Sequence, residues 1–488
     1  SSPADSSTKS GGVVTVAAGS DIPSLDPVRM RGVGGGTDQG VQVMDTLLSY
    51  DEVTGSFGPK LAQSIDSEDA RTWVLGLREG VTFTDGEPLD ADAVVFNVQR
   101  HMAPDSPSVA KGLLADVASI EATGEYEVTI TLNEPSGSFP LVFSWASTAG
   151  MIGSPKALAD PEKFGRMPVG AGPFMLESWT VDDRMVMVKN DDYWDEGIPY
   201  LEADTYVVLP VPQTRVDELV AGGVNSAQVA SGMWPRVNGD STLVLRPVDS
   251  VGTALVSNGS KGATSDQRVR DAISMAFDGE TTANVIFGGT EFWNGERSCI
   301  PFPSESPLCV EGSANEQDVD AASELVESFV TDGGDPTIEL VYIGVPDQAV
   351  YIQQQLGEIG LDITLRSVDI ATYFAAEQRG DYEMMLATTG LPEPLLWGRL
   401  YSGATNWGQV AYPDVDAALI TARNGVTLEE RTEGWRDAVQ AIQDHASVVW
   451  LYPWPVAMGY SADLRFGEEG DSYPGTPLAY FDQAWFDQ

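Results

Sequence analysis

Two stretches say most about this chain: GVTFTDGEPLDADAVVFNVQR at residues 80–100 and VGAGPFMLESWTVDDRMVMVKNDDYW at residues 169–194. The first predicts a strand, a tight turn on Asp85-Gly86 and an amphipathic helix, because glycine adopts the positive φ that such a turn requires. The second predicts a glycine-rich chain reversal, a pair of strands and an aromatic anchor. Neither stretch contains a nucleophile, a cluster of metal ligands or a phosphate-binding loop, so we interpret both as structural framework.

The charge of the chain restricts its partners. Its 488 residues include 27 Lys or Arg and 73 Asp or Glu, which gives a formal net charge of −46. Such a field repels phosphate backbones and anionic lipid head groups, so nucleic acid is not expected as a partner. We interpret the acidity as a heavily hydrated surface that suits a saline or extracytoplasmic habitat. The length predicts two or three domains.

The first ten residues, SSPADSSTKS, predict a disordered, solvated linker. Such a start is typical of the tether that follows a processed export signal, which favours an extracytoplasmic location. No apolar run approaches the roughly 20 residues that cross a bilayer. The longest candidate, Val448–Tyr460, is interrupted by Pro453 and Pro455.

The chain has two cysteines, Cys299 and Cys309, which flank a loop rich in proline. Outside the cytoplasm a disulfide is the natural interpretation of such a pair, and two reduced thiols are the alternative. A zinc site is disfavoured because it would need two more ligands.

The chain predicts an α/β protein with mixed sheets. The first half suggests strands at 11–18, 73–77, 81–83 and Val128–Leu132, and a helix at Val41–Tyr50. The second half opens with a helix at 268–277, for which Ser265-Asp266 is the expected cap. An alternating series follows: strand Thr337–Ile343, helix Pro346–Ile359, strand Leu361–Val368, helix Ile370–Arg379, strand Tyr382–Thr388, helices at about 414–424 and 428–446, and strand Val448–Tyr452. Short connections in that order predict parallel pairing.

These segments divide into two lobes. We expect lobe I at 11–254 and lobe II at 255–455, after the linker at 1–10. The aromatic-rich segment 456–488 is expected to return to lobe I, because its side chains need a core to pack on. The two chain crossings, near 250–256 and 453–460, would then form a hinge.

A dozen motifs, in one order, resemble the extracellular solute-binding proteins of the peptide/nickel type, family 5, that serve ABC importers. Besides the two opening stretches, the residues that carry the resemblance include LDP at 25–27, DTLLSYD at 45–51, LAQSID at 61–66, VTITLNEP at 128–135, SPKAL at 154–158, VRDAISMAFD at 269–278, IQQQLGEIGLDITLRSVD at 352–369 and NWGQVAYPDVDAAL at 406–419. The resemblance implies a two-lobed periplasmic-binding-protein-like fold with an extra subdomain at about 42–165. It also implies a monomer that is attached to the membrane by an N-terminal lipid anchor. This monomer needs no cofactor and no metal.

The function implied by the resemblance is capture without chemistry. A small solute, such as a peptide-like, aromatic or carboxylate compound, is held between the lobes and delivered to a membrane permease and its ATPase. Segments that match cleft-lining loops of the family supply the candidate ligand contacts Met30, Arg31, Trp145, Thr389, Trp397, Tyr401, Asn406 and Trp407. Tryptophan offers a large rigid surface for stacking, and Arg31 could pair with a carboxylate. Burial in a core is the alternative for each tryptophan, and a plain surface position is the alternative for Arg31.

One departure from the family bears on the ligand. Peptide-binding members carry an Asp, just before an acidic-Pro pair, that holds the α-amino group of the peptide. Here the loop reads TTGLPEP at 388–394, so Gly390 replaces that acid and Glu393 alone remains. Because a buried ammonium without a counter-charge is costly, the sequence favours a ligand without a free amine. A metal-chelate binder of the nickel type is an alternative, although His101 and His445 both lie in predicted helices and are interpreted as packing residues.

Two other functions are alternatives to an importer component. An enzyme is disfavoured because no Ser-His-acid, Cys-His or phosphate-loop pattern is evident, and GVGGG at 32–36 lacks the GxGxxG spacing. A ligand-sensing receptor module for a signalling partner is the alternative to an importer component, and neighbouring permease and ATPase genes would favour import.

Overall fold

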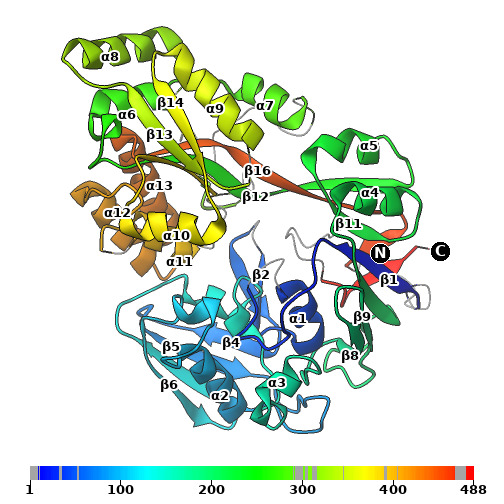
Figure 1. The fold of residues 1–488 in the computed structure, drawn as a ribbon. Coiled ribbons are helices and arrows are strands. Elements are labelled where there is room, and N and C mark those ends of the chain that lie inside the picture. The colour runs from blue at the N-terminus through cyan, green and yellow to red at the C-terminus, as the bar shows by residue number, and fades with distance from the viewer. Residues whose placement is uncertain are drawn as a thin grey trace, which may run out of the picture. The chain divides into compact units, whose positions relative to one another are not determined.

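The computed structural model describes Lys9, Glu291 and the ranges 11–31, 36–51, 54–289, 301–302, 306–309, 316–344, 346–388, 393–403, 405–467 and 480–487. The chain forms two compact units (Figure 1). Unit 1 is Ser1–Val248 with Val456–Gln488, and unit 2 is Asp249–Pro455. The long strands β12 (Leu243–Ser257) and β16 (Val448–Ser461) carry residues of both units. Each unit is an α/β structure, which confirms the predicted fold class.

The main sheet of unit 1 is mixed. β1 (Val13–Ala18) pairs in parallel with β10 (Ala203–Val208) and with β11 (Ser226–Val229). The sheet continues antiparallel from β10 to β9 (Arg184–Lys189) and β8 (Phe174–Thr180). On the other side, β11 pairs antiparallel with residues 457–460 of β16. The helix α1 (Thr37–Met44) packs on β8, so Val41 and Met44 share one core with Val14 and Val16.

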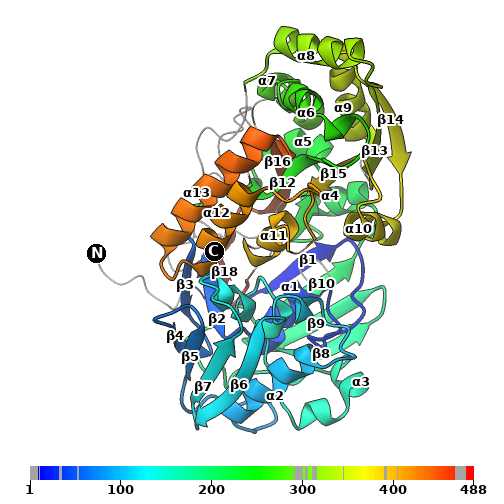
Figure 2. The same ribbon diagram turned by 90° about the vertical axis from the view of Figure 1, so that its left-hand side faces the viewer.

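The segment between β1 and β8 carries a second, antiparallel sheet (Figure 2). Its order is β4 (Ala62–Asp66), β5 (Thr72–Leu77), β7 (Glu127–Leu132) and β6 (Val117–Gly124). The helix α2 (Ala91–Met102) packs on β6 and β7, and its N-cap Asp90 accepts a hydrogen bond of 2.9 Å from the amide of Ala93. A hairpin of β2 (Leu48–Asp51) and β3 (Ser56–Pro59) lies next to β4.

Unit 1 is completed by short elements. They are α3 (Pro161–Phe164), α4 (Pro212–Val220), α5 (Trp234–Asn238), β17 (Leu464–Phe466) and β18 (Ala484–Phe486), together with 3₁₀ turns at Val109–Lys111, Phe139–Phe143, Thr148–Gly150, Ala157–Ala159 and Ser231–Met233. β17 and β18 pair antiparallel near the end of the chain. Phe466 and Phe481 from this C-terminal segment are buried in the same core as α1.

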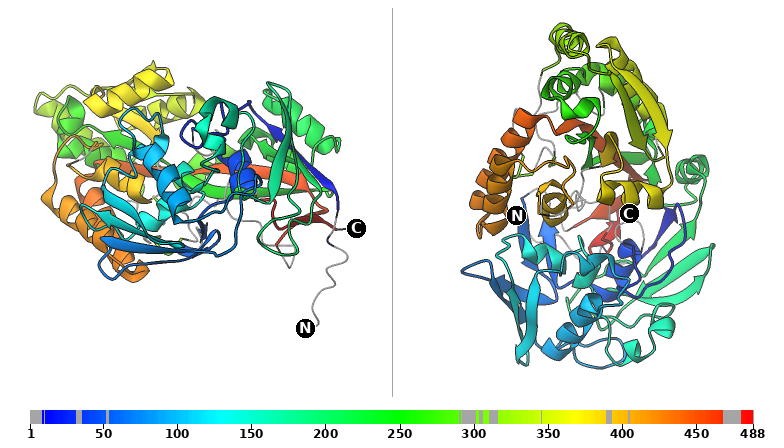
Figure 3. Two further views of the ribbon diagram at one scale, coloured as in Figure 1. Left: turned by 90° about the horizontal axis from the view of Figure 1, so that it is seen from below. Right: turned by 60° about the vertical axis from the view of Figure 1, so that its left-hand side comes forward.

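Unit 2 is a sheet with helices on both faces (Figure 3). β14 (Asp362–Ser367), β13 (Thr337–Tyr342) and β15 (Met384–Thr388) run parallel, which confirms the parallel pairing expected from their alternation with helices. β12 pairs antiparallel with β15. The helices are α6 (Gln267–Ser274), α7 (Gly279–Phe287), α8 (Val319–Thr331), α9 (Pro346–Glu358), α10 (Ile370–Arg379), α11 (Glu393–Leu400), α12 (Pro413–Asn424) and α13 (Leu428–His445), and a 3₁₀ turn lies at Ala263–Ser265.

Alternation along the strands of unit 2 separates two cores. Met384 and Leu386 pack with residues of α6, α8 and α9, whereas Met385 and Ala387 pack with residues of α12 and α13. Successive side chains of a strand point to opposite faces, so both faces of this sheet are buried.

Some predicted elements were wrong in extent. The helix expected at Val41–Tyr50 ends at Met44, and Leu48–Asp51 is the strand β2. The helix stops because Asp45 adopts a positive φ of 58° and turns the chain. The strand expected at 81–83 is a single bridge between Thr82 and Pro88, and the helix expected to reach residue 277 ends at Ser274. Its predicted cap is confirmed, because Asp266 accepts from the amide of Arg268.

Several residues named in the predictions from the sequence lie outside the described residues. These are the linker except Lys9, most of the GVGGG segment, Cys299, Thr389 and Gly390. The disulfide therefore stays a prediction. Within the described part of the chain, none of the helices has both the length and the apolar character of a membrane span.

The glycine-rich reversal at the start of the second opening stretch rests directly on α1. The amide of Gly172 donates to the carbonyl of Val43 at 2.9 Å, and the carbonyl of Gly170 accepts from Thr84 at 3.0 Å. A Cβ on Gly172 would lie 2.5 Å from the carbonyl oxygen of Gln42, which no side chain tolerates. Glycine is thus required here by close approach of two backbones.

We expect Gly172→Ala to destabilise the protein by about 3 kcal/mol, because the α1 backbone must move to relieve the overlap. Gly112→Ala is the matched control, since Gly112 has a helical φ of −63° and a Cβ there meets nothing within 4 Å among the described residues. Thermal and urea unfolding measure both. Equal midpoints for the two variants would contradict the close-packing argument.

A buried acid in the core of unit 1 makes stability depend on pH. Asp204 has no solvent exposure, lies between Val14 and Met187 in the sheet, and accepts no well-formed hydrogen bond from the described residues at either carboxylate oxygen. Burial raises its pKa well above the ordinary value of 3.8 and outweighs the opposing effect of the nearby Tyr206 hydroxyl. The folded state therefore binds a proton that the unfolded state has already released, and stability falls as the pH rises from that ordinary value toward the raised pKa.

Asp204→Asn removes this proton while keeping the shape of the side chain. We expect the variant to gain stability relative to the parent as the pH is raised from about 5 to 8, by up to about 1.4 kcal/mol per pH unit. Melting temperatures across that range measure the difference, with the exposed Asp105→Asn as control. A difference that does not change with pH would show that Asp204 is ionised in the folded protein.

Candidate functional site

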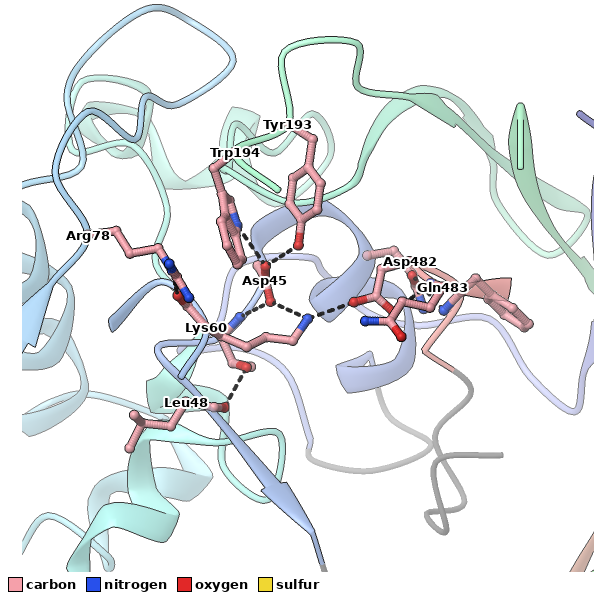
Figure 4. A network of polar contacts seen from close by, with 11 residues as sticks. Asp45, Leu48, Lys60, Arg78, Tyr193, Trp194, Asp482 and Gln483 are labelled. Atoms are coloured by element: carbon pink, nitrogen blue, oxygen red, sulfur yellow. Dashed lines mark hydrogen bonds and ion pairs between the residues drawn. The ribbon is translucent and has the colours of Figure 1, made fainter. Parts of the chain in front are cut away.

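A buried carboxylate organises a polar network in unit 1 (Figure 4). Asp45, directly after α1, has no solvent exposure. Its Oδ2 accepts hydrogen bonds from the Tyr193 hydroxyl at 2.6 Å and from the Trp194 Nε1 at 3.1 Å. Its Oδ1 lies 3.1 Å from the Nζ of Lys60. The NDDYW motif therefore supplies packing and hydrogen bonds to the DTLLSYD motif, in agreement with the structural interpretation of its aromatic residues.

Lys60 extends the network to the C-terminal segment. Its Nζ lies 2.8 Å from Oδ2 of Asp482 and 4.9 Å from the ring centroid of Tyr480. Burial lowers the pKa of Lys60, but Asp45 and Asp482 together outweigh it and place the pKa well above its usual value. The ammonium therefore stays charged between two carboxylates. The charged and hydrogen-bonding side chains of this cluster are bound to one another, so the cluster joins the C-terminal segment to the rest of unit 1.

The other sequence motifs also bind one another. The carboxylate of Asp85 in the first opening stretch accepts from the hydroxyl of Ser154 in SPKAL at 2.7 Å. Two residues later in each motif, Glu87 accepts from Lys156 at 2.7 Å. In LDP, the buried Asp26 accepts from Arg100, near the end of α2, at 2.7 Å. These contacts explain the spacing of the motifs and assign them to folding.

Three of the predicted ligand contacts belong to unit 1. Met30 is 1% exposed and packs against the glycine face of α1, near Gly40. Trp145 is 5% exposed and donates from Nε1 to the carbonyl of Tyr50 at 3.0 Å. Both therefore lie in the core of their own unit. Arg31 is exposed, and no ion pair of its guanidinium is found among the described residues.

Unit 2 supplies the remaining predicted contacts that the structure describes. Trp397 and Tyr401 are half-buried and stack on each other, with ring centroids 4.4 Å apart. The Nε1 of Trp397 donates to the carbonyl of Leu419 on α12 at 2.8 Å. Asn406 adopts a positive φ of 47° and donates from its amide to the carbonyl of Val410. Trp407 is completely buried, so the described structure leaves it no surface for a ligand.

Buried acids near these aromatics are paired internally. Glu377 on α10 accepts from Nε1 of Trp407 at 2.6 Å and forms an ion pair with Arg399. Glu393, the acid that remained in TTGLPEP, accepts from Nε1 of Trp435 at 2.9 Å and lies 3.3 Å from Nε of Arg431. Burial raises the pKa of Glu393, and Arg431 and Trp435 act against that rise. Sequence reasoning missed these pairs, because no spacing rule links residues that meet only in the folded unit.

Both histidines contact other side chains of the described structure. His101 is buried, its Nδ1 lies 2.6 Å from the hydroxyl of Ser108, and burial lowers its pKa to about 3. His445 stacks on Tyr412 and lies 3.0 Å from Oδ2 of Asp414. In the described part of the chain, no group of three or more His, Cys, Asp and Glu side chains is arranged to hold a metal ion.

Comparison with known proteins gives one consistent family. The family model described as bacterial extracellular solute-binding proteins, family 5 Middle, matches residues 56–408. The glutathione-binding protein GsiB of Salmonella paratyphi A is 29% identical over 388 residues, which cover 75% of this chain and 71% of that protein. The nickel-binding periplasmic protein of Escherichia coli K12 is 26% identical over 440 residues, which cover 81% and 80%.

A solved structure shows the same fold. The periplasmic binding protein DppA of Helicobacter pylori, in complex with the peptide STSA, superposes with a TM-score of 0.79 at 23% sequence identity. The match covers 99% of each chain. The predicted two-lobed periplasmic-binding-protein fold is confirmed.

We expect Lys60→Met to destabilise the protein by about 3–5 kcal/mol, because it leaves Asp45 and Asp482 buried without a counter-charge. Lys156→Met is the matched control, since Lys156 forms an exposed pair with Glu87 at the same 2.7–2.8 Å range of separation. Its unfolding midpoint should stay close to that of the parent. Chemical denaturation measures the stability of both variants. A Lys60 variant as stable as the control would contradict the role of Lys60 as the counter-charge of Asp45 and Asp482.

Proposed function

Because this chain belongs to the bacterial extracellular solute-binding proteins of family 5, we propose that it captures a small organic solute that has no free amine. Membership rests on the family match over residues 56–408. It makes the chain the substrate-binding component of an ABC importer, which passes its ligand to a membrane permease. The same family membership places the protein outside the cytoplasm. The lipid anchor, the monomeric state and the Cys299–Cys309 disulfide are further parts of the proposal.

The state of Glu393 supports a ligand without a free amine. A ligand ammonium taken from water needs a carboxylate partner to offset its desolvation. Glu393 is already bound by Arg431 and Trp435, and Glu377 by Arg399 and Trp407. Neither buried acid is therefore available near the predicted aromatic contacts without breaking an existing ion pair.

The predicted contacts with accessible surface suit a flat or acidic ligand. The stacked pair Trp397 and Tyr401 is half-buried, with the guanidinium of Arg423 4.6 Å from the ring centroid of Trp397, and its accessible part offers an aromatic surface. The exposed guanidinium of Arg31 offers two parallel donors to a carboxylate. Candidate ligands are aromatic acids, saccharides and peptides with a blocked N-terminus. Ligand stabilises the form to which it binds more tightly, and this population shift is what signals the loaded state to the permease.

The test compares ligands that differ only in the amine. We expect N-acetyl-Ser-Thr-Ser-Ala to raise the melting temperature more than free Ser-Thr-Ser-Ala, because binding to the folded state stabilises it by mass action. Reduced glutathione and the nickel complex of L-histidine, which test the ligand classes of the two relatives, should give smaller shifts than the acetylated peptide. Trp397→Ala should remove the shift, while Phe96→Ala, at an exposed position on α2, should keep it.

A larger shift with the free tetrapeptide than with its acetylated form would overturn the amine-free ligand class. A shift that survives in Trp397→Ala would remove Trp397 from the binding surface.

A further inference from the structure

Helix α11 is held at its first residue by a buried charged group. Glu393 begins the helix and is 6% exposed. Its two carboxylate oxygens face different partners on α13: Oε1 accepts from the indole of Trp435 and Oε2 lies 3.3 Å from the guanidinium of Arg431. Arg431 and Trp435 are also buried, and they are one helical turn apart on α13.

The other end of α11 is held in the same way. Arg399, next to the last residue of the helix, forms an ion pair with Glu377 of α10, which is 2% exposed. Oε1 of Glu377 also accepts from the indole of Trp407. The backbone closes this ring, because the amide of Trp407 donates to the carbonyl of Arg399 at 2.7 Å. One acid, one guanidinium and one indole thus meet at each end of the helix.

Of the two side chains proposed to touch the ligand, Trp397 lies between these two ends, and its stacking partner Tyr401 directly follows the last residue of the helix, Leu400. Trp397 and Tyr401 lie one turn apart, and the amide of Tyr401 donates to the carbonyl of Trp397 at 2.9 Å. Beyond them, the amide of Ser402 donates to Asp416 of α12 at 2.9 Å. The stacked pair therefore lies on α11 and on the residue that directly follows it, between the contacts of Glu393 and Ser402, while its own rings remain half-buried.

A buried ion pair is a poor way to gain stability, because desolvation of both charges offsets their attraction. Its stronger effect is geometric, since each charge must stay within contact of its partner to avoid an uncompensated buried charge. Anchors of this kind at both ends would hold the intervening aromatic side chains to the sub-ångström tolerance that a binding site needs.

We propose that Glu377 and Glu393 are positioning residues that fix α11, and with it Trp397 and Tyr401, in the orientation that receives the ligand. The inference rests on the proposed function, because it assigns Trp397 and Tyr401 to the binding surface. Neither acid touches the ligand. Each acts through an arginine and a tryptophan.

The test separates orientation from stability. In Glu377→Gln the amide keeps the acceptor for Trp407 but leaves Arg399 without its counter-charge. Glu339→Gln is the matched control, because Glu339 pairs with Arg366 at 2.9 Å in the same unit and both side chains are well exposed. Amide hydrogen exchange of residues 393–403 and the dissociation constant of N-acetyl-Ser-Thr-Ser-Ala are measured for each variant, well below the melting temperature.

We expect Glu377→Gln to speed exchange in 393–403 more than elsewhere in unit 2 and to raise the dissociation constant about tenfold. The control should change neither. The double variant Glu377→Gln/Arg399→Gln removes the orphan charge, so it should recover melting temperature while binding stays weak. If Glu377 contributed to stability alone, the double variant would instead recover both ligand binding and melting temperature.

Uniform exchange across unit 2, or a dissociation constant that follows the melting temperature through the three variants, would overturn the proposal. If the parent protein does not bind the acetylated peptide, the proposed ligand class fails, and unchanged exchange in Glu377→Gln would still overturn the anchoring of α11 on its own.

Discussion

The buried carboxylate of Asp45 is the contact on which unit 1 depends. An acid with no access to water is tolerated only when its lone pairs are satisfied, and here a cation, a phenol and an indole satisfy them. The donors come from Lys60, Tyr193 and Trp194, and Lys60 carries the link on to Asp482 near the end of the chain. Segments more than 400 residues apart in the sequence therefore meet at one site, and unit 1 is complete only when its C-terminal segment has returned.

This requirement explains why the most recognisable stretches of the chain contact one another. Asp45 needs a positive φ to turn its side chain inward, so α1 must end at Met44, and the space that this leaves is filled by the backbone of Gly172. The glycine turn at Gly172 and the end of α1 at Met44 are therefore parts of one packing arrangement. The motifs therefore reflect how the segments pack against one another, and they do not identify the ligand.

The same constraint marks the limit of prediction from the sequence. Alternating strands and helices in unit 2, the turn at Gly86 and the cap at Asp266 follow from local rules, so they could be predicted. The end of α1 could not, because its cause lies in Lys60, Tyr193 and Trp194. The candidate site was harder for a related reason. Trp397 and Trp407 look alike in the sequence, yet one is half-buried and the other is fully buried on Glu377, and only the three-dimensional pairing separates them.

The pairing of buried acids also connects the folding chemistry to the choice of ligand. The net charge of −46 suggests a protein well supplied with partners for a cationic ligand, but most of that charge is solvated and screened at the surface. Inside unit 2, Glu377 and Glu393 are each paired with an arginine. The desolvation of these charges takes place during folding, before any ligand binds. A ligand ammonium would have to displace a guanidinium that binds the carboxylate at least as well. A ligand carboxylate would meet no such competitor at Arg31, for which no ion pair is found among the described residues, whereas an aromatic ring at Trp397 would meet the guanidinium of Arg423. An acidic protein can therefore favour neutral or acidic ligands, because the acids that matter for selection are those left without a partner after folding.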